Sequence, residues 1–218
     1  MYPIYQPHTA SPSAAGKPSF DSTVSLKIGV LALQGDFREH LQVLETLGID
    51  GIEVRRESEL HQVDGLIIPG GESTAMQKLA QSFALWNPLR DAIHAGMPVF
   101  GTCAGLILLA TRITDGIAGQ ESLAALDVTV RRNAFGNQLD SFETELAVAG
   151  INGPVHAAFI RGPVIEEVGE GVEVLARLHD GRVVAARSGN ALGISFHPEV
   201  TGETRIHRLF ADMVLSAR

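Results

Sequence analysis

Apolar residues in the first half of the chain follow two alternating patterns, short continuous runs and helical repeats. Residues 26–33 and 65–68 are short, largely apolar runs, which are typical of buried strands. Between them, segment 37–47 carries apolar residues at three- and four-residue spacing, and Gly48 follows as a stop signal. The same reasoning predicts strands at 51–55 and 97–100 and helices at 73–81, 88–95 and 104–111.

The second half is richer in strand patterns. Strands are predicted at 126–131, 142–148, 155–160, 172–178, 183–187 and 193–196, and a helix at 203–216. Asp180-Gly181 lies between two of these strands and is a strong hairpin signal. The alternation of strand and helix in the first half implies a parallel sheet with helices on both faces. The expected fold is therefore α/β, with three layers: a mostly parallel central sheet, flanking helices and extra antiparallel strands.

The length and the amino-terminal composition predict a single domain preceded by a tail. A chain of 218 residues suits one hydrophobic core. Residues 1–25 are rich in Pro, Ser, Ala and Thr and lack the basic start and apolar stretch of a secretory signal. Such a segment buries too little apolar surface to fold alone. We expect residues 1–25 to be a disordered tail and residues 26–218 to form one domain.

Charge and cysteine content narrow the class of protein. The formal net charge is -8, and an acidic protein is a poor partner for the phosphate backbone of nucleic acids. No stretch reaches the roughly 18 consecutive apolar residues of a membrane span. The one cysteine excludes an internal disulfide, so a reducing compartment is expected. These features predict a cytoplasmic protein without membrane or nucleic-acid partners.

The cysteine lies in a motif that predicts a nucleophile. Residues 101–105 read Gly-Thr-Cys-Ala-Gly, between a predicted strand and a predicted helix. This is the cysteine version of the strand–turn–helix elbow that presents a nucleophile above a parallel sheet. An isolated cysteine is more often a small buried apolar residue. The two glycines and the flanking elements instead favour Cys103 as the nucleophile, with the backbone N–H of Ala104 facing a substrate carbonyl.

A base and its orienting group are predicted at the end of another strand. His197-Pro-Glu199 follows residues 193–196, and open α/β sheets place their sites at such strand ends. In an extended chain, residues two apart project to the same side, so Glu199 could bond one ring nitrogen of His197. The other nitrogen would face the thiol, as in a catalytic triad. No catalytic role is assigned to the remaining histidines: His8, His40, His61, His94, His156, His179 and His207.

Further candidates are a glycine turn and several arginines. Residues 69–73 read Pro-Gly-Gly-Glu-Ser after a predicted strand, and Ser73 is expected to cap the next helix. The N–H of Gly71, with that of Ala104, could form an oxyanion hole. An ordinary turn and a phosphate loop are alternatives, although the P-loop lysine is missing. An arginine can recognise a carboxylate through its planar guanidinium, although most arginines are surface residues. The candidates for carboxylate recognition are Arg131, Arg132 and Arg161.

These motifs together resemble a known family. Residues 32–40, 69–74, 100–106, 131–143, 159–163 and 195–199 match the pattern of the glutaminase subunits of pyridoxal 5'-phosphate synthase, which are class I glutamine amidotransferases. The elbow and His-Pro-Glu are shared by the whole class, whereas Ala-Leu-Gln-Gly, Arg-Asn-x-Phe-Gly and Phe-Ile-Arg are typical of this subunit. The resemblance runs from about Leu26 to Val214. Gly162, where alanine is frequent, and Asn137, where a basic residue is usual, depart from it.

The resemblance implies an activity, a site and a partner. It implies that Cys103 is the nucleophile, His197 the base and Glu199 its orienting group. The residues implied to bind glutamine are Gly71, Glu72, Ser73, Arg132, Ile160 and Arg161. It also implies a synthase subunit that uses the ammonia with ribose 5-phosphate and glyceraldehyde 3-phosphate, an assembly of twelve copies of each subunit, and low glutaminase activity before docking. No metal or organic cofactor is needed for this hydrolysis.

Two other interpretations remain open at this stage. The chain could serve another class I amidotransferase, such as that of histidine biosynthesis, which shares the triad but not the Ala-Leu-Gln-Gly and Phe-Ile-Arg segments. It could also be a redox-sensing or chaperone-like protein with an exposed elbow cysteine. Such a protein has no need of His197-Pro-Glu199. The segment Gln34-Gly35-Asp36, expected beside the site, is a candidate signal for docking.

Overall fold

The computed structural model describes residues 25–132, 134 and 141–218, so most of the predicted tail and Asn137 lie outside the described residues. A large sheet runs through the protein in the order β2-β1-β3-β4-β12-β11-β9-β6-β5, and β10 pairs with β11. Its strands are β1 (Lys27–Leu31), β2 (Asp50–Val54), β3 (Gly65–Ile68), β4 (Val99–Thr102), β5 (Ala110–Thr114), β6 (Leu126–Arg131), β9 (Val164–Val168), β10 (Glu173–Arg177), β11 (Val183–Ser188) and β12 (Ala191–Ile194). A separate hairpin pairs β7 (Phe142–Leu146) with β8 (Val155–Phe159).

The sheet is parallel on one side and mixed on the other. From β2 through β1, β3 and β4 to β12, every neighbouring pair is parallel. Beyond β12, the pairings with β11, β9 and β6 are antiparallel, and β5 returns parallel to β6. The predicted α/β class, with a mostly parallel sheet and added antiparallel strands, is confirmed.

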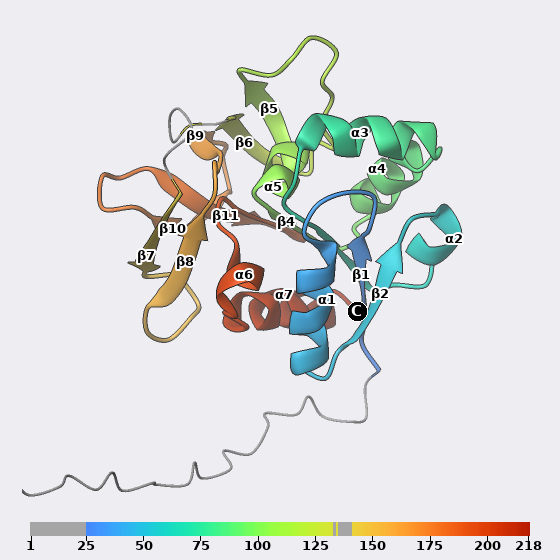
Figure 1. Ribbon diagram of the computed structural model, residues 1–218, viewed down its shortest axis with the longest axis horizontal. Coiled ribbons are helices and arrows are strands. Elements are labelled where there is room, and N and C mark those ends of the chain that lie inside the picture. Colours follow the sequence, from blue (N-terminus) through green and yellow to red (C-terminus); the bar gives the residue numbers. More distant parts are fainter. Residues whose placement is uncertain (1–24, 133, 135–140) are drawn as a thin grey trace, which may run out of the picture.

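Helices cover both faces of this sheet (Figure 1). On one face lie α1 (Phe37–Thr46) and α7 (Arg205–Ser216), with the short α6 (Pro198–Thr201) beside them. On the other face lie α3 (Ser73–Ser82), α4 (Trp86–His94) and α5 (Ala104–Leu109), and α2 (Glu57–Leu60) follows β2 at the edge. This arrangement gives the three layers that the alternation of strands and helices predicted.

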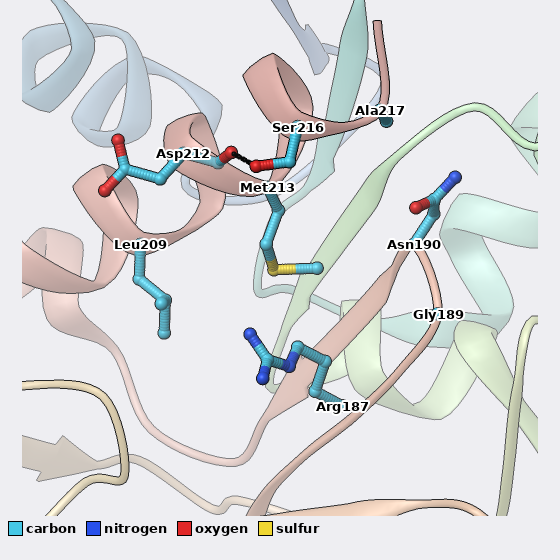
Figure 2. Close-up of a pocket in the computed structure, with 8 residues that line it drawn as sticks. All are labelled: Arg187, Gly189, Asn190, Leu209, Asp212, Met213, Ser216 and Ala217. Atoms are coloured by element: carbon cyan, nitrogen blue, oxygen red, sulfur yellow. Dashed lines mark hydrogen bonds between the residues drawn. The ribbon is translucent and has the colours of Figure 1, made fainter.

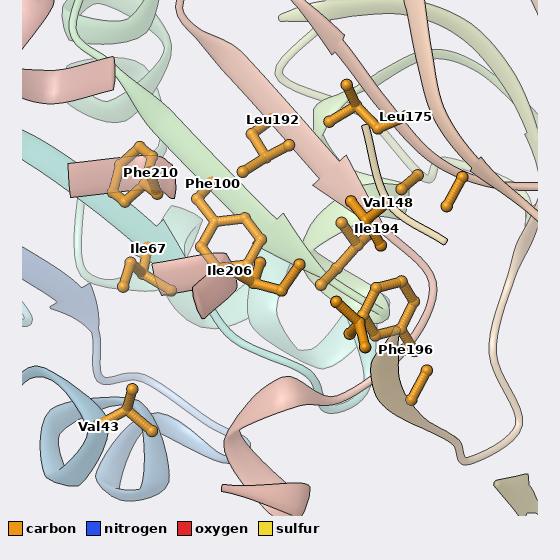
Figure 3. Packing of buried hydrophobic residues seen from close by; sticks show 14 of the residues in the cluster. Val43, Ile67, Phe100, Val148, Leu175, Leu192, Ile194, Phe196, Ile206 and Phe210 are labelled. Atoms are coloured by element: carbon orange, nitrogen blue, oxygen red, sulfur yellow. The ribbon is translucent and has the colours of Figure 1, made fainter. Parts of the chain in front are cut away.

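The alternation of side chains along the central strands divides the core into two clusters. In β3, Ile67 packs on the side of α1 and α7, whereas Leu66 and Ile68 pack on the side of α3 to α5. Figure 3 shows the first cluster, in which Phe100 and Phe210 lie between the sheet and α7. Both rings are fully buried and their centroids are 5.6 Å apart. A strand that carries apolar residues on both faces therefore packs against the helices on both sides of the sheet.

Most predicted elements are found, with a few differences. The hairpin at Asp180-Gly181 joins β10 to the antiparallel β11, as predicted. The strand predicted at 97–100 begins two residues later, as β4, and the helix predicted to continue to residue 111 ends at Leu109, where β5 begins. Four short elements were not predicted, namely α2, β5, β9 and α6. Each spans four or five residues, too few for periodicity to identify. None of the described helices is both long and apolar enough to cross a membrane.

Candidate active site

Cys103 lies at a sharp turn between β4 and α5. Its backbone has φ 48° and ψ −102°. Residues other than glycine rarely adopt this conformation, which costs about 1–3 kcal/mol. The N–H of Cys103 donates to the carbonyl oxygen of Ile194 at 2.9 Å, so the neighbouring strand β12 holds the turn in place. This is the strained elbow that the Gly-x-Cys-x-Gly motif predicts.

The two glycines of the elbow are required by close backbone contacts. A Cβ atom on Gly101 would lie 2.5 Å from the carbonyl carbon of Gly105. A Cβ atom on Gly105 would overlap the carbonyl oxygen of Ile68 at the end of β3. One of these backbone groups belongs to α5 and the other to the end of β3, and neither can move freely, so both positions require glycine.

His197 and Glu199 form a buried hydrogen-bonded pair beside this elbow. Nδ1 of His197 lies 2.8 Å from Oε1 of Glu199, and both residues are less than 10% exposed. The local structure differs from the extended chain that the sequence suggested. His197, with φ −114°, is the N-cap of α6, and Pro198 occupies its first turn. Because Nδ1 is used by Glu199, Nε2 is the nitrogen left to serve the thiol of Cys103.

The charges of the pair favour an imidazolium. Burial alone would lower the pKa of His197, but interactions with Cys103 and Glu199 outweigh it and raise this pKa to about 10. Burial raises the pKa of Glu199, and the hydrogen bond and positive charge of His197 act against that rise. A protonated His197 beside the thiol stabilises a negative sulfur, which is the reactive form of cysteine.

A cavity of about 450 Å³ opens above Cys103. It brings together residues from six separate parts of the chain. Every residue predicted to bind substrate or to form the oxyanion hole lines it: Gly71, Glu72, Ser73, Ala104, Arg132, Ile160 and Arg161, with Cys103 and His197. Glu199 lies behind His197 and does not line the cavity. The thiol of Cys103 points toward the carbonyl oxygen of Ile160, 3.9 Å away.

Glu72 links the two sides of this cavity. Its carboxylate accepts hydrogen bonds from the N–H groups of Thr74 and Ala75, at 3.0 and 2.7 Å, so Glu72 caps α3 and the predicted cap, Ser73, is instead the first helical residue. Glu72 also pairs with Arg132 at 3.1 Å. Burial raises the pKa of Glu72, but these hydrogen bonds and the charge of Arg132 together outweigh it and lower this pKa.

Of the three candidate arginines, Arg132 and Arg161 line the cavity and Arg131 lies outside it. Arg132 is mostly buried and donates to Oε1 of Gln120 at 2.7 Å, which fixes its guanidinium at the cavity wall. Arg131, by contrast, pairs with Glu166 and Asp115 at 2.6 and 2.8 Å. A cation held in this way beside a polar cavity can bind a carboxylate.

Some contacts near the site were not predicted from the sequence. Asp36, whose segment was expected beside the site, lines the cavity, and its carboxylate lies 3.6 Å from Nδ1 of His197. Burial raises the pKa of Asp36, against the effect of His197. His40, to which the sequence assigned no role, is fully buried 3.5 Å from Glu199. The motif Gln-Gly-Asp followed by Glu-His was visible in the sequence, but its approach to His197 depends on contacts between distant segments.

Asp36, His197 and Glu199 also place one potential ligand atom each within 4.8 Å of one another. The ring nitrogen of His197 that belongs to this group is already hydrogen-bonded to Glu199. The arrangement therefore fits an acid–base pair with a second carboxylate nearby better than it fits a metal centre.

A second hollow, of about 300 Å³, lies between the β11–β12 turn and α7 (Figure 2). Arg187, Leu209 and Met213 point toward it. Arg187 is engaged by Glu173 at 2.6 Å, and the lining contains neither cysteine nor histidine. The hydroxyl of Ser216 in this lining donates to the carbonyl oxygen of Asp212 in its own helix and has no histidine beside it. The cavity above Cys103 is therefore the candidate active site.

Comparison with known proteins agrees with this geometry. The model of the SNO glutamine amidotransferase family matches residues 30–216. The pyridoxal 5'-phosphate synthase subunit PdxT of Nocardioides sp. is 56% identical over 200 residues, which cover 90% of this chain and 100% of that relative. The subunit PdxT of Leifsonia xyli subsp. xyli is 59% identical over 85% of this chain and 94% of its own length. A crystal structure of a glutamine amidotransferase superposes with a TM-score of 0.80 at 49% identity, covering 86% of this chain and 98% of that one.

Proposed function

The chain belongs to the SNO glutamine amidotransferase family, and from this premise we propose that it hydrolyses glutamine with the cavity above Cys103. It is a glutaminase, and the ammonia that it releases serves the synthesis of pyridoxal 5'-phosphate by a synthase subunit. The observation that carries the assignment of the site is the buried His197–Glu199 hydrogen bond beside an elbow cysteine. A redox sensor or chaperone has no use for that pair.

The first half of the reaction forms a thioester. Nε2 of His197 already carries the thiol proton, and the negative sulfur of Cys103 attacks the side-chain amide carbon of glutamine. The carbonyl oxygen becomes an oxyanion, which the N–H groups of Gly71 and Ala104 stabilise. His197 then returns its proton to the amide nitrogen, the C–N bond breaks, and ammonia leaves.

The second half releases glutamate. Nε2 of His197 takes a proton from water, and the resulting hydroxide attacks the thioester carbon. The C–S bond breaks, the sulfur leaves as a negative ion beside the protonated His197, and glutamate is released as its new carboxyl group loses a proton to water. Glu199 does not change its protonation in either half. It holds the ring of His197 by Nδ1 and stabilises the imidazolium.

Substrate binding is assigned to the walls of the same cavity. Arg132 supplies a fixed positive charge for the carboxylate of glutamine, and Glu72 supplies a negative charge for its amino group. Ser73, Ile160 and Arg161 complete the wall. These opposite charges are presented in one pocket, which supports an amino acid as the substrate.

The partner is a synthase subunit of pyridoxal 5'-phosphate synthase, and the proposed assembly contains twelve copies of each subunit. Ile160 and Val200 border the cavity with 43% and 52% of their surface exposed, and a docked subunit would cover them. The hydrolase step belongs to this chain, and the lyase chemistry belongs to the synthase. The free cysteine supports the cytoplasm as the compartment.

Segment 34–36 is proposed to transmit docking to the oxyanion loop. Oε1 of Gln34 accepts the N–H of Glu72 at 2.8 Å, and the N–H of Asp36 donates to the carbonyl oxygen of Gly70 at 3.2 Å. A Cβ atom on Gly71 would overlap Gln34, so the two loops touch directly. A partner that moves this segment would therefore also move the donors of the oxyanion hole.

The test is the release of glutamate from glutamine by the purified chain mixed with the synthase subunit of its own organism. Wild type is expected to produce glutamate, and Cys103→Ala is expected to lose at least a thousandfold in rate. Exchange of the partner for a histidine-biosynthesis synthase should give no stimulation. Equal glutamate release by wild type and Cys103→Ala would refute the proposed function.

A further inference from the structure

Two buried histidines extend the His197–Glu199 pair into the core. His40 on α1 and His207 on α7 are both 0% exposed. Nδ1 of His40 lies 2.8 Å from Nε2 of His207. On its other side, Nε2 of His40 lies 3.2 Å from Oγ1 of Thr102 and 3.5 Å from Oε1 of Glu199. A continuous polar path thus joins α7, α1, the end of β4 and α6 beneath the active site.

Both inner histidines are neutral. Burial lowers the pKa of His40 well below its usual value, and the charges of His207 and His197 lower it further. Burial lowers the pKa of His207 to about 3, and the backbone and the charge of Glu203 act in the opposite direction. Each ring therefore carries one proton, and the contacts of its two nitrogens decide where that proton lies.

The contacts allow one arrangement of the two protons that serves Glu199. Nδ1 of His207 has no partner in hydrogen-bond geometry among the described residues, although the backbone of Glu203 acts on this ring, and Nε2 lies against His40. In this arrangement the proton of His207 is on Nε2 and is donated to Nδ1 of His40. The proton of His40 must then be on Nε2, where it is donated to Thr102 and faces the carboxylate of Glu199.

Glu199 needs such a neighbour. Its carboxylate is buried, Oε2 has no hydrogen-bond partner among the described residues, and the charge of Asp36 also disfavours its ionised form. His197 is the charged group that opposes these effects. A protonated Nε2 of His40, 3.5 Å from Oε1, places a positive partial charge beside this oxygen and stabilises the carboxylate.

We propose that His40, oriented by His207, is a positioning residue that keeps Glu199 ionised and aligned with His197. This inference rests on the proposed role of Glu199, and it adds a residue behind the triad to which the sequence assigned no function. His40 does not touch the substrate. It acts on the reaction through Glu199, then His197, then the state of the Cys103 sulfur.

The sensitive measurement is the rate at which iodoacetamide alkylates Cys103 as a function of pH. This rate follows the negative sulfur, which depends on a protonated His197 and therefore on an ionised Glu199. In His40→Leu, Glu199 should take up a proton at a higher pH. The acidic limb, which is the fall in alkylation rate as the pH is lowered, is therefore expected to shift to higher pH by about one unit. In His40→Gln, the side-chain amide can donate from the place of Nε2, and the limb should return toward the wild-type position.

The controls separate positioning from packing. Phe210→Leu disturbs the same core cluster without removing a hydrogen bond of His40, and its acidic limb should not move. An unchanged limb in His40→Leu, no return in His40→Gln, or an equal displacement in Phe210→Leu would each overturn the proposal. If His40→Leu does not fold, the nitrogen chemical shifts of ¹⁵N-histidine-labelled wild type test the proposal instead. They report which ring nitrogen of His40 carries the proton, and a proton on Nδ1 would contradict the proposal.

The alkylation experiment needs neither glutamine nor the synthase. A wild type that releases no glutamate with its synthase would refute the proposed function and leave the alkylation profiles interpretable. Normal glutamate release combined with identical profiles in wild type and His40→Leu would refute only the role of His40.

Discussion

Oε1 of Glu199 lies 2.8 Å from Nδ1 of His197, although the two residues are separated by a proline that starts a helix. Pro198 fixes its own φ and needs no hydrogen-bond partner for nitrogen in the first turn of α6. The turn brings the carboxylate of Glu199 back onto the ring of its N-cap residue. This contact determines that Nε2, and not Nδ1, is directed to the chemistry.

Glu199→Gln should slow the reaction and change the titration of His197. The neutral amide removes the negative charge that helps to raise the pKa of His197 to about 10, so this pKa should fall toward its usual value. The imidazolium is then lost at a lower pH, and kcat is expected to drop by about a hundredfold or more. Histidine NMR titration and glutamate release measure the two effects.

Glu203→Gln is the matched control for that change. Glu203 is also a partly buried carboxylate of the carboxyl-terminal region, but it pairs with Arg205 and does not line the cavity. Its substitution should leave the titration of His197 and the value of kcat near those of wild type. The same His197 midpoint in wild type and Glu199→Gln would contradict the assigned role of Glu199.

The sequence predicted the parts of the site that are encoded locally. Gly101, Cys103 and Gly105 form a motif whose spacing alone specifies an elbow, and His197 follows a short apolar strand. The contact of His197 with Glu199 was predicted correctly from an extended chain, although the chain there forms a helix turn.

The sequence did not predict contacts that depend on how distant segments pack. His40 and His207 are 167 positions apart, and each looks like an ordinary surface histidine within its amphipathic helix. Asp36 reaches His197 because the β1–α1 loop crosses the turn after β3. The hydrophobic periodicity along the chain carries no information about contacts between such distant segments. The assignment of residues 26–218 to one domain remains a prediction.

Gly105→Ala should destabilise the protein. The new methyl group would overlap the carbonyl oxygen of Ile68, and the sheet must shift to admit it. We expect a loss of about 2–4 kcal/mol in the free energy of unfolding, measured by denaturant titration. In Gly116→Ala the methyl group would have its nearest neighbour 3.5 Å away, so that variant should differ from wild type by less than about 0.5 kcal/mol. Equal stability of the two variants would show that the elbow tolerates a side chain.

Arg132→Ala should weaken the binding of glutamine. The guanidinium lines the cavity and is held by Gln120 and Glu72, so its removal takes away the proposed partner of the substrate carboxylate. KM is expected to rise by about 10- to 100-fold with a smaller change in kcat. Arg131→Ala removes the neighbouring charge, which pairs with Glu166 and Asp115 outside the cavity, and should leave KM unchanged. An equal rise in both variants would point to a general effect of charge.

Gln34→Ala should reduce the stimulation of glutaminase activity by the synthase. The amide oxygen of Gln34 accepts the N–H of Glu72, next to Gly71, whose N–H is assigned to the oxyanion hole. Without that bond, movement of segment 34–36 is no longer passed to Gly71. We expect the ratio of activity with the synthase to activity without it to fall by about tenfold. This is less than the effect of removing an oxyanion-hole donor outright.

Binding and stimulation have to be measured separately in this variant. The affinity for the synthase should change less than the stimulated rate, since a single side chain at the edge of the cavity is removed. Gln62→Ala is the control, because Gln62 is exposed and, among the described residues, its side chain bonds only to the carbonyl oxygen of Ser58 within its own turn. Full stimulation in Gln34→Ala would exclude this side chain from the coupling. A loss of binding that equals the loss of rate would make Gln34 a contact of the interface and not a transmitter to the oxyanion loop.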